Sequence, residues 1–191
     1  ETVYDDTQME TGFRIGDLQL FTTHVSMEAH ICLERGDRNA EKILDRLLEL
    51  ADIYEYDYGR LARHSLFILL HYKLQEFYQV LELAPKGVQW IRDHLGNVPA
   101  RLMVYSVNIK ALFMLEKYDE LEETYREAED LARGEQLGPY FKSYFLTATL
   151  MFEIRELERF TLEGNRRTWA TQFRKTRKAG KWSLKTCKKI A

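Results

Sequence analysis

The histidines are the first residues in this chain that could do chemistry, because histidine binds metals and transfers protons. His24 and His30 are six positions apart and His64 and His71 are seven apart, and no cysteine or carboxylate completes a ligand set around either pair. The two cysteines lie far apart and form no pair motif. We therefore expect no metal ion and no cofactor.

A dense group of acidic side chains is the second chemical feature, because paired carboxylates can act as a general acid and base. These residues are Asp119, Glu120, Glu122, Glu123, Glu127 and Glu129. They fall within a predicted helix, where a solvated face near the positive N-terminus accounts for them. Neither a glycine-rich phosphate loop nor a serine or cysteine in a nucleophile context is present. We therefore expect a protein without catalytic activity.

The last part of the chain carries the strongest charge asymmetry. Residues 164–191 contain ten basic and no acidic residues, whereas residues 1–163 contain 18 basic and 30 acidic ones. Trp169, Phe173 and Trp182 are interleaved with these cations. Such a segment could bind nucleic acid, a membrane surface or an acidic protein groove, could cap the acidic body, or could be a solvated extension. The candidate anion-binding residues are Arg174, Lys175, Arg177, Lys178, Lys181 and Lys185.

The composition excludes the disordered and the membrane-spanning classes of protein. Of 191 residues, 45% are hydrophobic, 13% aromatic and 30% charged, which is typical of a globular domain. No apolar run approaches the roughly 20 residues that a membrane helix needs. The N-terminus lacks a signal peptide and an initial Met, so we expect a fragment or a processed product. Because Cys32 and Cys187 form no pair motif, we expect a reducing, cytoplasmic setting.

Hydrophobic residues at three- and four-residue steps predict helices along nearly the whole chain. We expect a flexible lead-in over residues 1–14 and then eight helices, which begin near residues 17, 39, 58, 76, 99, 118, 139 and 156. Pro85 falls inside the fourth helix, where a proline removes a hydrogen bond, so we expect a kink or a split there. No stretch alternates long enough to predict a strand.

The breaks within the four helix pairs recur at a nearly constant interval of 39, 41 and 39 residues. They are Gly36-Asp37-Arg38, Gln75-Glu76-Phe77, Glu116-Lys117-Tyr118 and Arg155-Glu156-Leu157. Repeated helix pairs cannot bury their apolar faces alone, so neighbouring pairs stack. We therefore predict an all-α fold, namely a right-handed α-α superhelix of about four stacked helical hairpins.

The central hairpin, residues 102–131, resembles a tetratricopeptide repeat. Leu121, Tyr125 and Ala128 match the apolar, aromatic and small positions of that family's second helix, and Tyr118 follows the turn. The second and fourth hairpins show the same pattern at Phe77, Val80, Ala84, Gly87, Leu157, Phe160 and Gly164. The period exceeds the family's usual value of about 34 residues, the usual Leu-Gly pair is absent, and the first hairpin needs an insertion.

The resemblance covers about residues 15–172 and implies a division of the chain into three parts. These are a lead-in over 1–14, a repeat domain over 15–173, and a basic tail or capping segment over 174–191. In such a domain the first helix of each pair lines a concave groove for an extended or helical peptide. The family's carboxylate clamp is not expected, because its asparagine positions hold Met27, Leu66 and Val107.

The groove positions implied by the resemblance are rich in aromatic residues, methionines and lysines. The rings would supply contact area, and the lysines would orient an acidic or C-terminal group. The candidates are His30, Tyr72, Lys73, Lys110, Phe113, Met114, Lys142, Phe145 and Phe152. A wider set adds Ser26, Leu33, Ser65, Leu69, Met103, Ser106 and Thr149.

These patterns predict a non-catalytic protein-protein interaction scaffold that binds a partner peptide in the groove, as part of a larger regulatory protein. One alternative is a nucleic-acid-associated protein that uses the basic C-terminal segment. Another is a peptide-sensing regulator, which would need an output domain outside these residues. The ends of a repeat array are also a surface for self-association.

Overall fold

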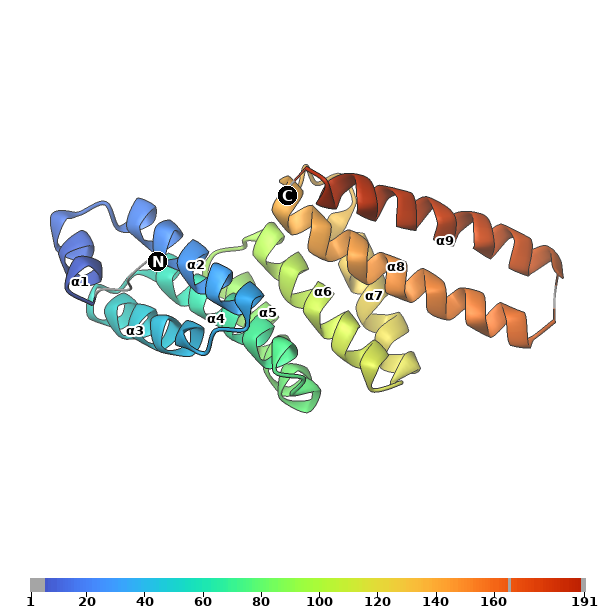
Figure 1. The fold of residues 1–191 in the computed structure, drawn as a ribbon, viewed down its shortest axis with the longest axis horizontal. Helices are drawn as coiled ribbons and strands as arrows, with labels where there is room; N and C mark the ends of the chain where they lie inside the picture. The colour runs from blue at the N-terminus through green and yellow to red at the C-terminus, as the bar shows by residue number, and fades with distance from the viewer. Residues whose placement is uncertain (1–5, 165, 190–191) are drawn as a thin grey trace.

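The computed structural model describes residues 6–164 and 166–189, and these residues form an all-α fold (Figure 1), as predicted. The described residues contain nine helices and no strand. The helices are α1 (Asp6–Ile15), α2 (Leu18–Arg35), α3 (Asn39–Ile53), α4 (Asp57–Lys73), α5 (Phe77–His94), α6 (Val98–Met114), α7 (Tyr118–Ala132), α8 (Pro139–Leu162) and α9 (Arg166–Cys187). Within the described ranges, none of them is long and apolar enough to cross a membrane.

The helices pack in sequential pairs. Helix α2 packs on α3, α4 on α5, α6 on α7 and α8 on α9. The first members of these pairs, α2, α4, α6 and α8, also contact one another in turn, and we call them the first-helix row. In Figure 1, α1 and α9 lie at opposite ends of the molecule, with α4, α5 and α6 between them. This arrangement is consistent with stacked hairpins.

Each of the four hairpin turns contains a residue with left-handed backbone conformation. These residues are Gly36, Gln75, Glu116 and Gly164, with φ of 70°, 62°, 57° and 73°. A left-handed residue at a helix end lets the next N–H group return to a free carbonyl of the last turn, as the Asp37 N–H does by donating to the Cys32 carbonyl at 2.8 Å. The first three predicted breaks begin at these residues and are confirmed.

The fourth predicted break, at residues 155–157, is wrong. Helix α8 continues without interruption to Leu162, and the turn comes at Gly164. The stretch contains no glycine, proline or asparagine to end a helix. In addition, the Arg159 guanidinium pairs with Glu156 and Glu163 along the same helix, which favours its continuation. The last hairpin is therefore longer than the others.

Residues 6–15 form helix α1, although the sequence analysis expected a flexible lead-in there. This helix packs on α2, and Gly12 allows the close approach, because a Cβ atom at that position would lie 2.2 Å from the Phe21 ring. A helix of ten residues is marginal in isolation, so its formation depends on tertiary packing. The remaining residues of the expected lead-in, 1–5, lie outside the described residues.

Helix α5 runs as one helix through Pro85, so the expected split does not occur. Val80, Ala84 and Ile91 are buried on one face of this helix, whereas Pro85 is exposed. The proline ring therefore points away from the core, and burial of the opposite face holds the two halves together. Packing outweighs the lost hydrogen bond at this position.

Two side chains fix helix starts that the sequence predicts. The Asp17 carboxylate accepts a hydrogen bond from the Leu20 N–H at 3.0 Å and caps α2. The Asn97 side chain accepts one from the Ala100 N–H at 2.9 Å and caps α6, with Pro99 in the first turn. These caps set where two helices of the first-helix row begin.

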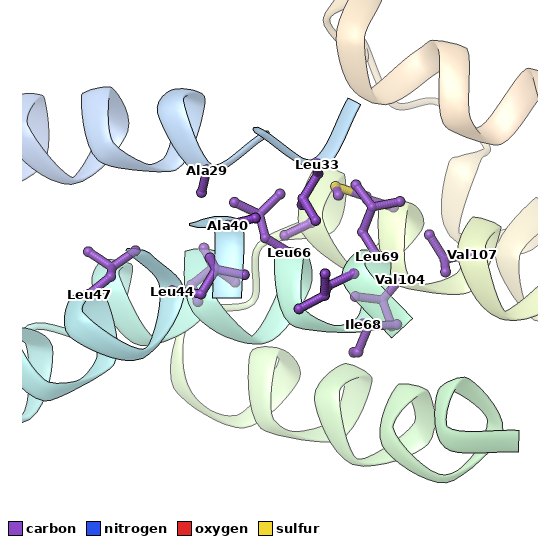
Figure 2. Close-up of a cluster of buried hydrophobic side chains, with 14 of the residues drawn as sticks. Ala29, Leu33, Ala40, Leu44, Leu47, Leu66, Ile68, Leu69, Val104 and Val107 are labelled. Atoms are coloured by element: carbon purple, nitrogen blue, oxygen red, sulfur yellow. The ribbon is translucent and has the colours of Figure 1, made fainter. Parts of the chain in front are cut away.

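The hydrophobic core consists of two clusters of buried side chains that meet at α6. The larger cluster draws on α2 to α6, and Figure 2 shows part of it, with Leu44 and Leu47 of α3 close to residues of α2 and α4. The smaller cluster joins α6 to α7 and α8 around Leu112 and Leu121. Helix α6 is apolar on nearly all sides, as expected of a helix at the centre of an all-α protein.

Candidate functional site

A groove of about 700 Å³ lies along the first-helix row. Every helix of that row contributes side chains to its wall, and the end of α9 contributes one more. The lining residues are His30 and Glu34 of α2, Leu69, Tyr72 and Lys73 of α4, Lys110 of α6, Tyr140, Ser143, Tyr144 and Thr147 of α8, and Cys187 of α9. The groove is thus built from the faces of several helices, none of which forms it alone.

Helical spacing explains how each helix presents its residues to the groove. Residues four positions apart lie on one face of a helix, and both His30 with Glu34 and Tyr140 with Tyr144 have this spacing. Between helices, the repeat interval brings equivalent positions of neighbouring helices to the same groove. Lys73 is 39 positions from Glu34, one repeat further along, and the two side chains meet across α2 and α4.

An aromatic cluster at the groove joins the first and last helices of the row. The Tyr140 hydroxyl lies 3.1 Å from Nδ1 of His30, and the two rings meet edge to face with centroids 5.1 Å apart. The Tyr144 ring lies 5.4 Å from that of Tyr140. Burial lowers the pKa of His30 below its usual 6.5 and raises the pKa of Tyr140 to about 12. This part of the groove is therefore polar but uncharged at neutral pH.

Glu34 supplies the one carboxylate among the groove-lining residues, and it already has a partner. The Lys73 ammonium lies 2.7 Å from Oε2 of Glu34, and Nε2 of His30 lies 3.8 Å from Oε1. The side chains of Glu34 and Lys73 are 48% and 37% exposed, so the pair contributes little to stability. Its effect is to neutralise both charges at one side of the groove.

Lys110 is the cation of the groove that lacks such a partner. It forms no ion pair and no hydrogen bond with the residues that the structure describes, and its Nζ lies 5.0 Å from the centroid of the Tyr144 ring. Burial lowers the pKa of Lys110 from 10.5 to about 8, Lys73 acts in the same direction, and Glu34 and Cys187 oppose the shift. At pH 7 Lys110 is still mostly charged, and no described residue forms an ion pair with it.

The structure brings four of the predicted groove candidates together, namely His30, Tyr72, Lys73 and Lys110, and Leu69 of the wider set lies beside them. The other candidates lie elsewhere. Phe113, Phe145 and Phe152 pack on the smaller core cluster, and Met114 and Lys142 are exposed outside the groove. In the wider set, Leu33 and Met103 are core residues, and the hydroxyls of Ser65 and Ser106 donate to carbonyls of their own helices.

On α8 the groove is lined by a different face of the helix from the predicted one. Lys142 and Phe145 were predicted there, whereas the structure has Tyr140, Ser143, Tyr144 and Thr147 there. A shift of two residues turns a side chain by about 200° around a helix, which is nearly the opposite side. The error follows from the wrong fourth break, because positions on α8 were counted from it. The run of tyrosines after Gly138-Pro139 was a signal that could have found them.

The predicted anion-binding residues all lie on α9 and are all exposed. This helix packs along α8. None of its described cations forms an ion pair with another described residue. The rest of the basic segment beyond Lys189 lies outside the described residues.

Metal and disulfide chemistry find no support in the described part of the chain. No group of three or more histidine, cysteine, aspartate and glutamate side chains there is placed to hold a metal ion. Cys32 and Cys187 are both free thiols, the first half-buried and the second exposed beside the groove. The groove therefore offers rings, hydroxyls and an amine for binding.

The chain matches no protein-family description, no curated protein and no solved structure. Paired helices of this kind carry many unrelated functions, so the fold alone does not identify one. The function has to be inferred from the chemistry of the groove and of α9.

Proposed function

We propose that this protein is a non-catalytic protein-protein interaction scaffold of the tetratricopeptide-like class, which binds a peptide segment of a partner in the groove along the first-helix row. The groove has the properties that such a ligand needs. Tyr72, Tyr140 and Tyr144 offer contact area with few rotatable bonds, and the hydroxyls and His30 offer hydrogen bonds. A superhelical stack of hairpins would extend this surface along the molecule.

The observation that carries the proposal is that the ammonium of Lys110 forms no ion pair with any described residue. A half-buried cation without a counter-ion costs stability, and it is retained here next to rings that could hold a ligand. A carboxylate of a bound segment would supply the missing partner. The neighbouring carboxylate of Glu34 cannot repel such a group strongly, because Lys73 already neutralises it. We therefore propose that Lys110 pairs with an acidic side chain or a C-terminal carboxylate of the partner.

A peptide array tests this function with a defined set of probes. The array would hold decapeptides of varied aromatic and aliphatic content, each in a form with one Glu and a matched form with Gln. The full chain is compared with Lys110→Met, and with Lys142→Met as a control, because Lys142 is an exposed lysine on α8 outside the groove. We expect the parent and the control to prefer the Glu forms and Lys110→Met to lose the preference.

The outcomes separate the two parts of the proposal. Binding of peptides without a preference for Glu, unchanged in Lys110→Met, would keep the peptide groove but remove the role of Lys110. Binding that survives Tyr140→Ala and Lys110→Met together would place the peptide somewhere other than the groove. The absence of binding by every peptide would argue against the scaffold function itself.

The scaffold proposal includes a cellular setting and a context in a longer chain. Two free thiols, Cys32 and Cys187, suit a reducing compartment such as the cytoplasm. A module that only binds a peptide needs another domain to act on the result, so we place it within a larger regulatory protein. Neither point is needed for the array experiment, which concerns the groove alone.

A further inference from the structure

Helix α9 has two chemically different faces. Gln172, Ala179 and Ser183 are buried against α8, and Thr176 lies between them in sequence and is half-buried. All the cations of the described part of α9 are exposed. Because successive residues turn by about 100° around a helix, Arg174, Lys178, Lys181 and Lys185 form one stripe on the side opposite to α8. The stripe is about 17 Å long at about 1.5 Å per residue.

The contacts that hold α9 in place leave this stripe free. The Gln172 side-chain amide donates to the carbonyl of Glu153 at 3.1 Å and to its carboxylate at 2.5 Å, and the Thr176 hydroxyl donates to the same carbonyl at 3.0 Å. The carboxylate of Glu153 on α8 is therefore engaged by an amide. Figure 1 shows α9 lying along α8 at the end of the molecule, and among the described helices it packs closely on no other.

Phe173 and Trp182 lie on either side of the cationic stripe, whereas the Trp169 indole N–H donates to the Thr161 hydroxyl of α8 at 3.1 Å. Trp169 and Phe173 stack with ring centroids 5.2 Å apart, yet they are 38% and 43% exposed. On the other side Trp182 is 54% exposed, and the Lys178 ammonium lies 4.5 Å from the centroid of its ring. Exposed rings beside unpaired cations match the needs of a chain of phosphates with accessible bases, because phosphates pair with cations and bases stack on rings.

We propose that the outward face of α9 binds single-stranded nucleic acid, with the phosphates on the stripe of Arg174, Lys178, Lys181 and Lys185 and with bases on the flanking rings. The observations favour this partner over a membrane surface. A helix that lies in a membrane interface needs a continuous apolar face, whereas the rings of α9 sit on opposite flanks and its small-residue face is occupied by α8. This surface is separate from the peptide groove, and the proposal does not depend on a peptide ligand.

Fluorescence anisotropy of the full chain tests the proposal. The probes are a labelled oligothymidine of about 20 nucleotides, a duplex of the same length, and vesicles of phosphatidylcholine with phosphatidylserine, each at about 50 and about 200 mM salt. The test variant replaces Arg174, Lys178, Lys181 and Lys185 with glutamine, which keeps helix propensity. The control replaces four exposed cations elsewhere, Arg38, Lys42, Lys86 and Arg92, with glutamine and so changes net charge equally. Circular dichroism confirms that both variants are folded.

The expected result is salt-sensitive binding of the single strand that the test variant weakens at least about tenfold and the control does not. The slope of log affinity against log salt should fall by roughly three in the test variant, since four phosphate contacts are lost. Phe173→Leu should weaken the binding of the single strand and leave the binding of the duplex unchanged. Equal losses in the two glutamine variants, tighter binding of the duplex or of the vesicles, or no binding at the lower salt would each overturn the proposal.

Discussion

The hydroxyl of Tyr140 lies 3.1 Å from Nδ1 of His30, although the two residues are 110 positions apart in the sequence. The contact joins α2 to α8, which are the first and last members of the first-helix row. Between them, each helix of the row touches its neighbours. This one hydrogen bond therefore links the two ends of the row across the groove, and several of its expected effects can be measured.

Removing the hydroxyl of Tyr140 should loosen this link without changing the packing of its ring. We expect Tyr140→Phe to lower the free energy of unfolding by about 1 kcal/mol, since one partly buried hydrogen bond is lost. Urea denaturation followed by circular dichroism would measure the change. Tyr78→Phe is the matched control, because Tyr78 is 72% exposed. An equal effect in both variants would contradict a structural role for the hydrogen bond.

Acid should destabilise the protein in part through His30. Burial lowers the pKa of His30, Lys73 lowers it further and Glu34 opposes the shift, so the folded state binds a proton less readily than the unfolded state. The free energy of unfolding should therefore fall as the pH drops below 6.5. In His30→Gln this fall should be smaller, as measured by urea midpoints at about pH 7.5 and 5.5. His24→Gln, at an exposed position, should behave like the parent.

Lys110 should reduce stability at neutral pH. Its pKa is lowered from 10.5 to about 8, so the folded state loses a proton that the unfolded state keeps. The cost is complete below pH 8 and disappears as the pH rises through 10.5. We expect Lys110→Met to raise the free energy of unfolding at pH 7 by on the order of 2 kcal/mol and to lose this gain at high pH. A gain that did not change with pH would indicate better apolar packing instead.

At equivalent positions of two hairpin turns, we expect substitutions to change the free energy of unfolding in opposite directions. Gly36 and Glu116 both have left-handed backbone, but only glycine adopts it without a steric penalty. We expect Gly36→Ala to lower the free energy of unfolding by about 1 kcal/mol and Glu116→Gly to raise it by about 0.5 kcal/mol. Thermal and urea denaturation of both variants would measure this. Changes of the same sign would mean that the turns are not equivalent.

The contact between α3 and α4 depends on Gly59. A Cβ atom at this position would lie 2.7 Å from Cβ of Ala51, so the two helices would have to move apart. We expect Gly59→Ala to cost about 1–3 kcal/mol of unfolding free energy. At Gly138, a Cβ atom would meet nothing within 4 Å, so Gly138→Ala should change stability little. Similar stabilities for the two variants would show that the close approach is unimportant.

Much of the fold could be predicted from the sequence, because helices and the turns between them leave local patterns in it. Apolar spacing identified the helical class, and the breaks at Gly36, Gln75 and Glu116 fell where the chain turns. The fourth break failed because Arg155 and Glu156 are polar yet favour helix, and polarity alone does not end one. Helix α1 and the absence of a split in α5 were missed for a related reason. Both depend on burial against other helices, and a local sequence pattern does not predict such burial.

The candidate site was predicted only on the three helices whose breaks were right. His30, Tyr72 and Lys110 come together because a regular interval repeats one face of a helix along the row. Tyr140 and Tyr144 were missed because a two-residue error moves the assignment to the opposite face of α8. The missing partner of Lys110 could not be predicted at all. It depends on which carboxylates other elements bring near, and Glu34 is taken by Lys73.

Cys187, at the end of α9, lines the groove beside Lys110, so one helix carries the proposed nucleic-acid surface along its length and a piece of the groove wall at its tip. A ligand that shifts or stiffens α9 would therefore act on a wall of the proposed peptide groove. Thermodynamic linkage is reciprocal. If bound nucleic acid changes the affinity for a peptide by some factor, the bound peptide changes the affinity for nucleic acid by the same factor. Under the two proposals together, the place of α9 would couple the binding of the peptide to the binding of the nucleic acid.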